Sequence, residues 1–317
     1  MKIPFISNYL KLKKMEKIQG LIAAAFTPFH EDGSLNLNMI PVIVDKLVND
    51  GLKGVFVCGS NGEGPNMTTE ERMLVTEAFV KAANGRLMII VHVGHSSIAE
   101  SRKLAAHAAA VGADAFSSVA AFYFKPTSVE TLANCMAQIA SAAPDLPFYY
   151  YHIPTLTGVG MDMVEFLKYA GTLIPNLAGI KYTSSTIHEY QSCLEFEHGK
   201  FDVLFGFDEL LLPALSIGAQ GAIGSTYCFA APQYLKTIEV FKQRDTEAAR
   251  KQHAFMVEVI RIFARYPSVP AQKAIMKMLG WDMGPCRLPL VTLSKEQYDK
   301  LNMELAEISF FEKVQGA

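Results

Sequence analysis

The chain has 317 residues, of which 50% are hydrophobic and 19% charged, and its formal net charge is −2 at pH 7. This composition suits a globular protein with a large core, either one α/β barrel or two ordinary domains. The nearly balanced charge, without a long basic run, argues against nucleic-acid and membrane-surface partners. No stretch reaches the roughly 18 consecutive apolar residues that a membrane span needs.

Eight short apolar runs, each followed by a stretch long enough for a helix, occupy most of the chain up to Pro232. One helical stretch, from Ser97 to Val111, ends before Gly112, and another begins at Thr68, ahead of two glutamates. Repeated strand–helix units predict a parallel sheet, and eight of them predict an α/β fold closed as a (β/α)8 TIM barrel. The predicted strands are Leu21–Phe26, Gly54–Cys58, Met88–Val93, Ala115–Val119, Phe148–Tyr151, Ala178–Tyr182, Val203–Phe205 and Ala222–Gly224.

Beyond Pro232 the strand signals fade and the pattern is mostly helical. We therefore predict an N-terminal arm or extension at residues 1–14, a barrel at 15–232, and a C-terminal helical domain at 233–317 packed against the barrel. The first residues lack the sustained apolar segment of a signal peptide. The five cysteines are widely spaced and include no C-x-x-C pair, which predicts neither a disulfide framework nor a zinc site. A reduced, cytoplasmic setting is the simplest interpretation.

Lys181 ends a short apolar run that is typical of a buried strand. In a TIM barrel the chemistry lies at the carboxyl ends of the strands, so a polar residue in this position is a candidate. Desolvation favours the neutral amine, which is the form that a Schiff-base nucleophile requires. Thr183 follows two residues later and faces the same way. The alternative is a lysine just past the strand that points into water.

A glycine-rich turn with Ser60 and Asn61 follows the second predicted strand, within Gly59–Gly64. Glycines let the backbone approach a ligand closely, and successive amides that open a helix form an anion site for a carboxylate or a phosphate. The pattern is neither a Walker A loop nor G-x-G-x-x-G. A turn without any ligand is an equally good interpretation.

Three tyrosines end the fifth predicted strand. Alternation places Tyr149 and Tyr151 on one face and Tyr150 on the other. A phenol at the end of a strand can transfer a proton if a nearby cation lowers its pKa. Aromatic packing is the alternative for each of these tyrosines.

Carboxylates and hydroxyls end the last two predicted strands. Gly206, Asp208, Glu209 and Ser225 lie there, and such groups suit a polyol. Helix N-capping by the aspartate and the serine is the alternative.

His92 and His95 lie close together at the end of the third predicted strand. Metal binding would need a third donor, and neither H-E-x-x-H nor a carboxylate cluster accompanies them. We interpret them as structural histidines and expect neither a metal nor a cofactor.

Taken together, these motifs resemble the class I pyruvate-dependent aldolases, the family that includes dihydrodipicolinate synthase and N-acetylneuraminate lyase. The resemblance runs from about Ile18 to the C-terminal helices. It implies a TIM barrel with a helical C-terminal domain, usually assembled as a homotetramer. The motifs that carry it are Gly59-Ser60-Asn61-Gly62-Glu63, Tyr151-His152-Ile153-Pro154, Gly179-Ile180-Lys181 and Gly221-Ala222-Ile223-Gly224-Ser225.

The resemblance also implies catalytic roles. Lys181 would form the Schiff base, and Tyr151 would be the phenol that transfers the proton. Ser60 and Asn61 would hold the substrate carboxylate, with Ser60 in a hydrogen-bond relay with Tyr151. Tyr123 would complete that relay, often across a subunit interface. Asn61 departs from the threonine that is usual in the family.

The resemblance further indicates the substrate. Leu156 stands where the synthases carry an arginine for a second carboxylate, so a dicarboxylate product is disfavoured. The remaining motifs imply aldol cleavage of N-acetylneuraminate (sialic acid) to N-acetylmannosamine and pyruvate, a step of sialic acid catabolism. The residues that would contact the sugar hydroxyls are Thr183, Gly206, Asp208, Glu209 and Ser225.

Two alternatives stay open from the sequence. The first is an aldolase for another 2-keto-3-deoxy sugar acid, and the second is a non-catalytic sugar-acid-binding protein on the same barrel. An open-sheet nucleotide-binding oxidoreductase is disfavoured, because no glycine fingerprint lies near the first strand.

Overall fold

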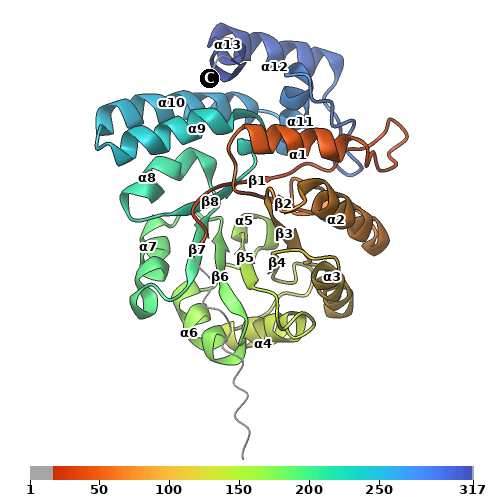
Figure 1. Ribbon diagram of the computed structural model, residues 1–317, viewed down its shortest axis with the longest axis vertical. Coiled ribbons are helices and arrows are strands. Elements are labelled where there is room, and N and C mark those ends of the chain that lie inside the picture. Colours follow the sequence, from red (N-terminus) through yellow and green to blue (C-terminus); the bar gives the residue numbers. More distant parts are fainter. Residues whose placement is uncertain (1–16, 316–317) are drawn as a thin grey trace, which may run out of the picture.

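The structure is a computed structural model that describes residues 17–315, so the arm expected at residues 1–14 lies outside the described residues. Eight parallel strands form a closed barrel in sequence order, with β8 paired to β1. Figure 1 shows the barrel strands surrounded by helices. The predicted (β/α)8 barrel and all its strands are confirmed. The strands are β1 (Gly20–Ala24), β2 (Gly54–Val57), β3 (Met88–His92), β4 (Ala115–Val119), β5 (Phe148–His152), β6 (Leu177–Tyr182), β7 (Asp202–Phe205) and β8 (Gly221–Gly224).

The predicted helix ends are also observed. The Thr68 hydroxyl accepts the Glu71 N–H, and the Glu71 carboxylate accepts the Thr68 N–H, which forms a capping box at the start of α2. Gly112 adopts φ +85° just after α3. The barrel helices are α1 (Met39–Asn49), η1 (Gly64–Asn66), α2 (Thr69–Ala83), α3 (Ile98–Ala110), α4 (Val129–Ala140), α5 (Pro154–Thr157), α6 (Met163–Leu173), α7 (Ile187–Glu195), η2 (Phe196–His198), η3 (Asp208–Leu210) and α8 (Leu211–Ser216).

The C-terminal helices gather on one side of the barrel, at the top of the view of Figure 1, with α12 and α13 above α1. The expected boundary at Pro232 falls inside α9, because this helix completes the eighth strand–helix unit and also packs against α10. Among residues 17–315, no helix combines the length and apolar character needed to cross a membrane. The C-terminal helices are α9 (Tyr227–Lys242), α10 (Thr246–Phe263), α11 (Ser268–Met278), α12 (Lys295–Glu307) and α13 (Phe310–Gln315).

Side chains fill the inside of the barrel. Tyr149 and Tyr151 belong to this inner cluster, whereas Tyr150 packs in the layer between strands and helices, as the alternation predicts. The Tyr149 hydroxyl donates to Asp202 Oδ2 at 2.9 Å near the amino end of the barrel. The barrel is thus packed toward its amino end, and its carboxyl end is left for a site.

Removing one inner side chain tests this packing. Leu204 is fully buried in the inner cluster. We expect Leu204→Ala to lower the free energy of unfolding by about 2–5 kcal/mol in urea titrations, because it leaves a cavity in the barrel. Leu74→Ala, at a side chain that is 46% exposed on α2, should change it by less than about 0.5 kcal/mol. Equal effects of the two substitutions would contradict a filled barrel interior.

Candidate active site

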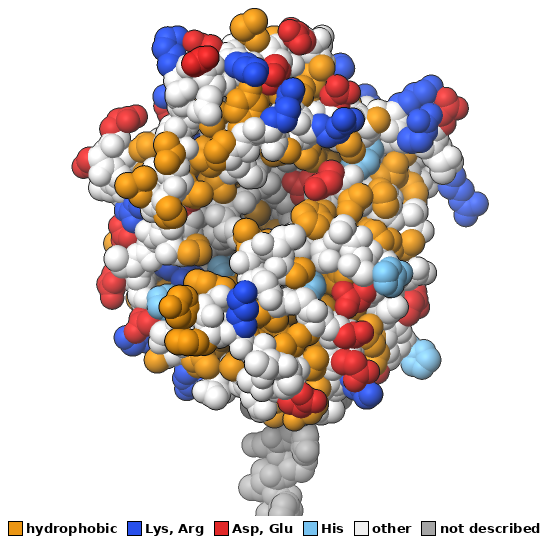
Figure 2. All heavy atoms as spheres, turned by 180° about the vertical axis from the view of Figure 1, so that it is seen from behind, with side chains coloured by type: hydrophobic (Ala, Val, Ile, Leu, Met, Phe, Trp, Pro, Cys, Tyr) orange, Lys and Arg blue, Asp and Glu red, His pale blue; other side chains and the backbone are white. Residues whose placement is uncertain are grey.

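A cavity of about 720 Å³ lies at the carboxyl end of the barrel, where the strand ends meet α10 and α11. Figure 2 shows the molecule hollowed near the centre of one face, below the C-terminal helices. Apart from Tyr123, every residue predicted for the site lines this cavity. They are Ser60, Asn61, Tyr151, Lys181, Thr183, Gly206, Asp208, Glu209 and Ser225.

Lys181 points into the barrel from β6, and only 3% of its surface is exposed. Its Nζ atom lies 3.9 Å from the ring centre of Phe56 and 4.0 Å from that of Tyr151. No carboxylate of residues 17–315 forms an ion pair with it. Burial lowers the pKa of Lys181 to about 7, and the charge of Asp208 opposes this fall. The buried strand position predicted from sequence is confirmed, and a large fraction of the amine is neutral at pH 7.

Strand register brings Tyr151 beside Lys181. The two residues are direct partners in the pairing of β5 with β6. Burial raises the pKa of Tyr151 to about 12, while the nearby hydroxyls of Ser60 and Thr183 favour its ionised form. Proton transfer by this phenol was expected if a nearby cation lowers its pKa, but the pKa shifts in the opposite direction because burial outweighs every other effect. Tyr151 is therefore a protonated phenol that needs a partner to move its proton.

The turn at Ser60 and Asn61 is held by backbone hydrogen bonds. The N–H of Glu63 donates to the carbonyl of Ser60 at 3.1 Å, and the Thr27 hydroxyl donates to the carbonyl of Gly62 at 2.6 Å. A Cβ atom at Gly64 would lie 2.0 Å from the Cys58 carbonyl oxygen, so the tight turn requires glycine there. The turn leads into the short 3-10 helix η1, and the α-helix α2 begins after it.

Polar residues that follow β7 and β8 line the same cavity as Lys181 and form what we call the polar wall: Asp208, Glu209 and Ser225. Asp208 is buried, and its Oδ2 atom accepts hydrogen bonds from the N–H and the hydroxyl of Thr226 at 2.9 and 2.6 Å. Burial raises the pKa of Asp208 to about 6, against the effect of these bonds and of Lys181. Burial also raises the pKa of Glu209. Neither the Asp208 nor the Ser225 side chain makes a capping hydrogen bond to the helix that begins beside it, and Asp208 instead accepts the N–H of Thr226 at the start of α9.

Two glycines give this wall its shape. A Cβ atom at Gly206 would lie 1.9 Å from the hydroxyl oxygen of Thr183, and one at Gly224 would lie 1.8 Å from Oδ1 of Asp208. The Thr183 hydroxyl is buried and makes no geometrically good hydrogen bond. The absence of side chains at these glycines thus lets two polar groups sit at the ends of β6 and β7.

Tyr123 is the exception among the predicted residues. It lies on the surface with 77% of its area exposed, packed edge-on against Phe124 at 4.9 Å between ring centres. Its neighbour Phe122 lines the cavity instead. Within one chain, the fold does not place Tyr123 beside Tyr151.

His92 lies at the end of β3 and lines the cavity. Its ring stacks on Phe56 and meets Tyr151 edge-on, with ring centres 5.8 and 5.6 Å apart. Burial lowers the pKa of His92 well below its ordinary value, which keeps the ring neutral. Within the described part of the chain, no three His, Cys, Asp or Glu side chains group as a metal site would require.

The far wall of the cavity was not predicted from the sequence. The candidates were taken from strand ends only, whereas this wall comes from helices and from the segment after α11. Two groups of prolines mark it in the sequence, one at 267–270 where α11 begins and one at 285–289 after α11. The residues of this wall are Ile260, Phe263, Ala264, Tyr266, Ser268, Val269, Gln272, Pro289 and Leu290, and α5 adds Thr155, Leu156 and Thr157 at the rim.

Comparisons with known proteins agree with this architecture. The profile of the Dihydrodipicolinate synthetase family matches residues 17–308. The Homo sapiens N-acetylneuraminate lyase is 39% identical over 300 residues, which cover 93% of this chain and 94% of that protein. The solved structure of Proteus mirabilis N-acetylneuraminate lyase has a TM-score of 0.90 at 40% identity and covers 93% of this chain and 100% of that chain.

The solved N-acetylneuraminate lyase (sialic acid aldolase) of Aliivibrio salmonicida is similarly close. Its TM-score is 0.91 at 42% identity, and the match covers 93% of this chain and 98% of that chain. Both the profile and these relatives span nearly the whole barrel and the C-terminal helices. The chain therefore belongs to the dihydrodipicolinate synthetase family.

Proposed function

We propose that this protein is a class I, Schiff-base aldolase that cleaves N-acetylneuraminate to N-acetylmannosamine and pyruvate. The observation that carries the proposal is the buried Lys181 amine, unpaired among the described residues and in contact with the Tyr151 ring at the base of a polar cavity. The relatives named N-acetylneuraminate lyase support the choice of substrate.

The reaction begins at Lys181. Its neutral amine attacks the keto carbon of the open-chain sugar acid, and loss of water gives an iminium ion. The Ser60–Asn61 turn holds the substrate carboxylate. Tyr151, assisted by that carboxylate, removes the proton of the C4 hydroxyl, and the bond between C3 and C4 breaks. The electron pair moves into the iminium ion and forms a neutral enamine, while N-acetylmannosamine leaves as the aldehyde.

The second half of the reaction restores the lysine. Tyr151 returns the proton taken from the C4 hydroxyl to C3 of the enamine, which gives the iminium ion of pyruvate, and water hydrolyses it. The water lost in the first half is thereby returned. Because the pKa of Tyr151 is raised to about 12, its proton must pass to a partner before it can act as a base. We assign that partner to Ser60, with Tyr123 completing the relay.

The polar wall suits the rest of the substrate. Asp208, Glu209 and Ser225 offer acceptors and a hydroxyl along one side of the cavity, and the backbone at Gly206 is accessible beside Thr183. Leu156 lines the same cavity, where an apolar side chain cannot pair with a second carboxylate. The hydroxyl chain of a sugar acid fits this wall better than a dicarboxylate does. An aldolase for another 2-keto-3-deoxy sugar acid would use the same wall.

The exposed aromatic residues Tyr123 and Phe124 are relevant to the assembly of subunits. Tyr123 and Phe124 expose 77% and 85% of their areas, more than large apolar side chains normally do. We infer a homotetramer in which Tyr123 of one subunit reaches the relay of its neighbour. We also place the enzyme in sialic acid catabolism in the cytoplasm, which the widely spaced free cysteines support.

Borohydride trapping tests the reaction. With N-acetylneuraminate, we expect peptide mass spectrometry to find a reduced pyruvyl adduct on Lys181. Lys181→Met should abolish the adduct, and Lys103→Met, at an exposed lysine on α3, should not. An adduct that carries the whole sugar acid would indicate a binding protein that forms an imine without cleavage. An adduct with free pyruvate alone would reject the substrate.

Lys181→Met should also stabilise the fold. Since burial lowers the lysine pKa from 10.5 to about 7, the unfolded chain holds this proton more tightly between those values. The wild-type protein is therefore destabilised at pH 7, on the order of several kcal/mol, and the penalty fades as the pH rises toward 10.5. We expect a higher melting temperature for the variant at pH 7 and a smaller difference at high pH. A variant less stable than wild type at pH 7 would contradict this account of the burial.

Tyr151→Phe tests the proton transfer. We expect turnover to fall by about 10²- to 10⁴-fold without a change in far-ultraviolet circular dichroism, because only the phenol oxygen is lost. Tyr150→Phe is the matched control, since its hydroxyl is buried on the other side of the strand, away from the cavity. If both variants retain wild-type turnover, Tyr151 has no part in the chemistry.

A further inference from the structure

We propose that Glu63 is a positioning residue that ties the Ser60–Asn61 turn to the C-terminal segment Met283–Leu290, which we call the strap. This inference rests on the proposed function, because it concerns how the same site holds the carboxylate of a keto acid. The strap lies outside the barrel sequence, yet it reaches the turn directly. Together, the turn and the strap would fix the position at which the carboxylate of the substrate binds.

Glu63 occupies a constrained position. Its side chain is fully buried, and its backbone adopts φ +52°, a conformation that few residues other than glycine take. Its N–H closes the turn on the carbonyl of Ser60. Its Oε1 atom lies 2.7 Å from Nζ of Lys273 on α11, and its Oε2 atom accepts the backbone N–H of Arg287 at 2.8 Å. Both carboxylate oxygens therefore contact the C-terminal region.

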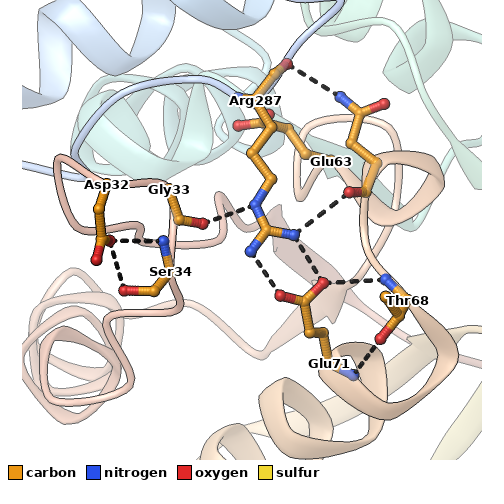
Figure 3. A network of polar contacts seen from close by, with 8 residues as sticks. Asp32, Gly33, Ser34, Glu63, Thr68, Glu71 and Arg287 are labelled. Atoms are coloured by element: carbon orange, nitrogen blue, oxygen red, sulfur yellow. Dashed lines mark hydrogen bonds and ion pairs between the residues drawn. The ribbon is translucent and has the colours of Figure 1, made fainter.

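The strap is anchored on several sides. Lys273 Nζ also donates to the carbonyl of Pro285 at 3.0 Å. The Arg287 guanidinium donates two hydrogen bonds, of 2.7 and 2.6 Å, to the Glu71 carboxylate. Its Nε donates to the carbonyl of Gly33 at 2.8 Å. Figure 3 shows this arginine between the Gly33 loop and the glutamate at the start of α2. A bidentate pair of this kind fixes orientation as well as distance.

These contacts link two walls of the cavity. Ser60 and Asn61 line it three and two residues before Glu63, and Pro289 and Leu290 line it just after Arg287. The two carboxylates and two cations of the cluster balance in charge. A buried ion pair gives little net stability compared with apolar residues of the same volume. The main consequence of the Glu63–Lys273 pair is therefore geometric, because the pair allows one arrangement of the turn and the strap.

The test replaces the buried pair with neutral groups of similar size. We expect the double variant Glu63→Gln/Lys273→Met to raise the half-saturating concentration of pyruvate in borohydride trapping by at least about tenfold. The maximal extent of trapping should stay at its wild-type value, because the surroundings of Lys181 are unchanged. For the same reason, the pH at which trapping reaches half of that extent should not change. The control is Lys46→Met, which removes a buried lysine paired with Asp50 on α1, away from the cavity. It should leave half-saturation unchanged even if its melting temperature falls.

A milder variant covers the case in which the double variant does not fold. Arg287→Gln loosens the outer, partly exposed arm of the cluster. It should raise half-saturation by about threefold or more and speed amide hydrogen exchange in residues 59–66. A folded double variant, or failing that an Arg287→Gln protein, that binds pyruvate within about twofold of wild type would overturn the inference. If wild-type protein itself traps no pyruvate on Lys181, the proposed function fails instead.

Discussion

The site depends on one constraint, which is that the amine of Lys181 is buried without a partner charge. A cation in that position would normally require a carboxylate beside it. Here the described residues provide two aromatic rings at about 4 Å, and Asp208 acts only at longer range through its charge. The pKa of the Lys181 amine is lowered as a result. An unpaired buried amine would destabilise a purely structural core, and its lowered pKa supports the proposed role of Lys181 as a nucleophile near neutral pH.

The closed barrel makes this arrangement possible. Parallel strands place Tyr151 and Lys181 side by side by register alone, and the packed interior below them excludes water. The same burial that lowers the pKa of the lysine raises that of the tyrosine, so it favours the neutral form of both groups. Neutral partners avoid the cost of two buried charges, and the proposed mechanism assigns proton movement to the hydroxyl of Ser60. Rigid strands hold this geometry more accurately than loops would.

The barrel and most of the site were predictable from the sequence, because both depend on local patterns. Short apolar runs located every strand, and the polar residues that end them, such as Lys181 and Asp208, converge because parallel strands share one carboxyl end. The wall from α10 and α11 was missed, since a helical pattern does not reveal which helix folds back over the barrel. The direction of the Tyr151 shift was also missed, because burial is a property of the assembled fold. Tyr123 lies on the surface, and the role proposed for it depends on a second chain.

The pH dependence of imine formation tests the central claim most directly. The initial rate of borohydride-trapped adduct formation on Lys181 would be measured with saturating pyruvate from about pH 5 to about pH 10, across the range in which a buried amine titrates. Since only the neutral amine reacts, the account predicts a rate that rises through a midpoint near pH 7 and then levels off. A rate that keeps rising up to pH 10, as for an ordinary exposed lysine, would contradict it.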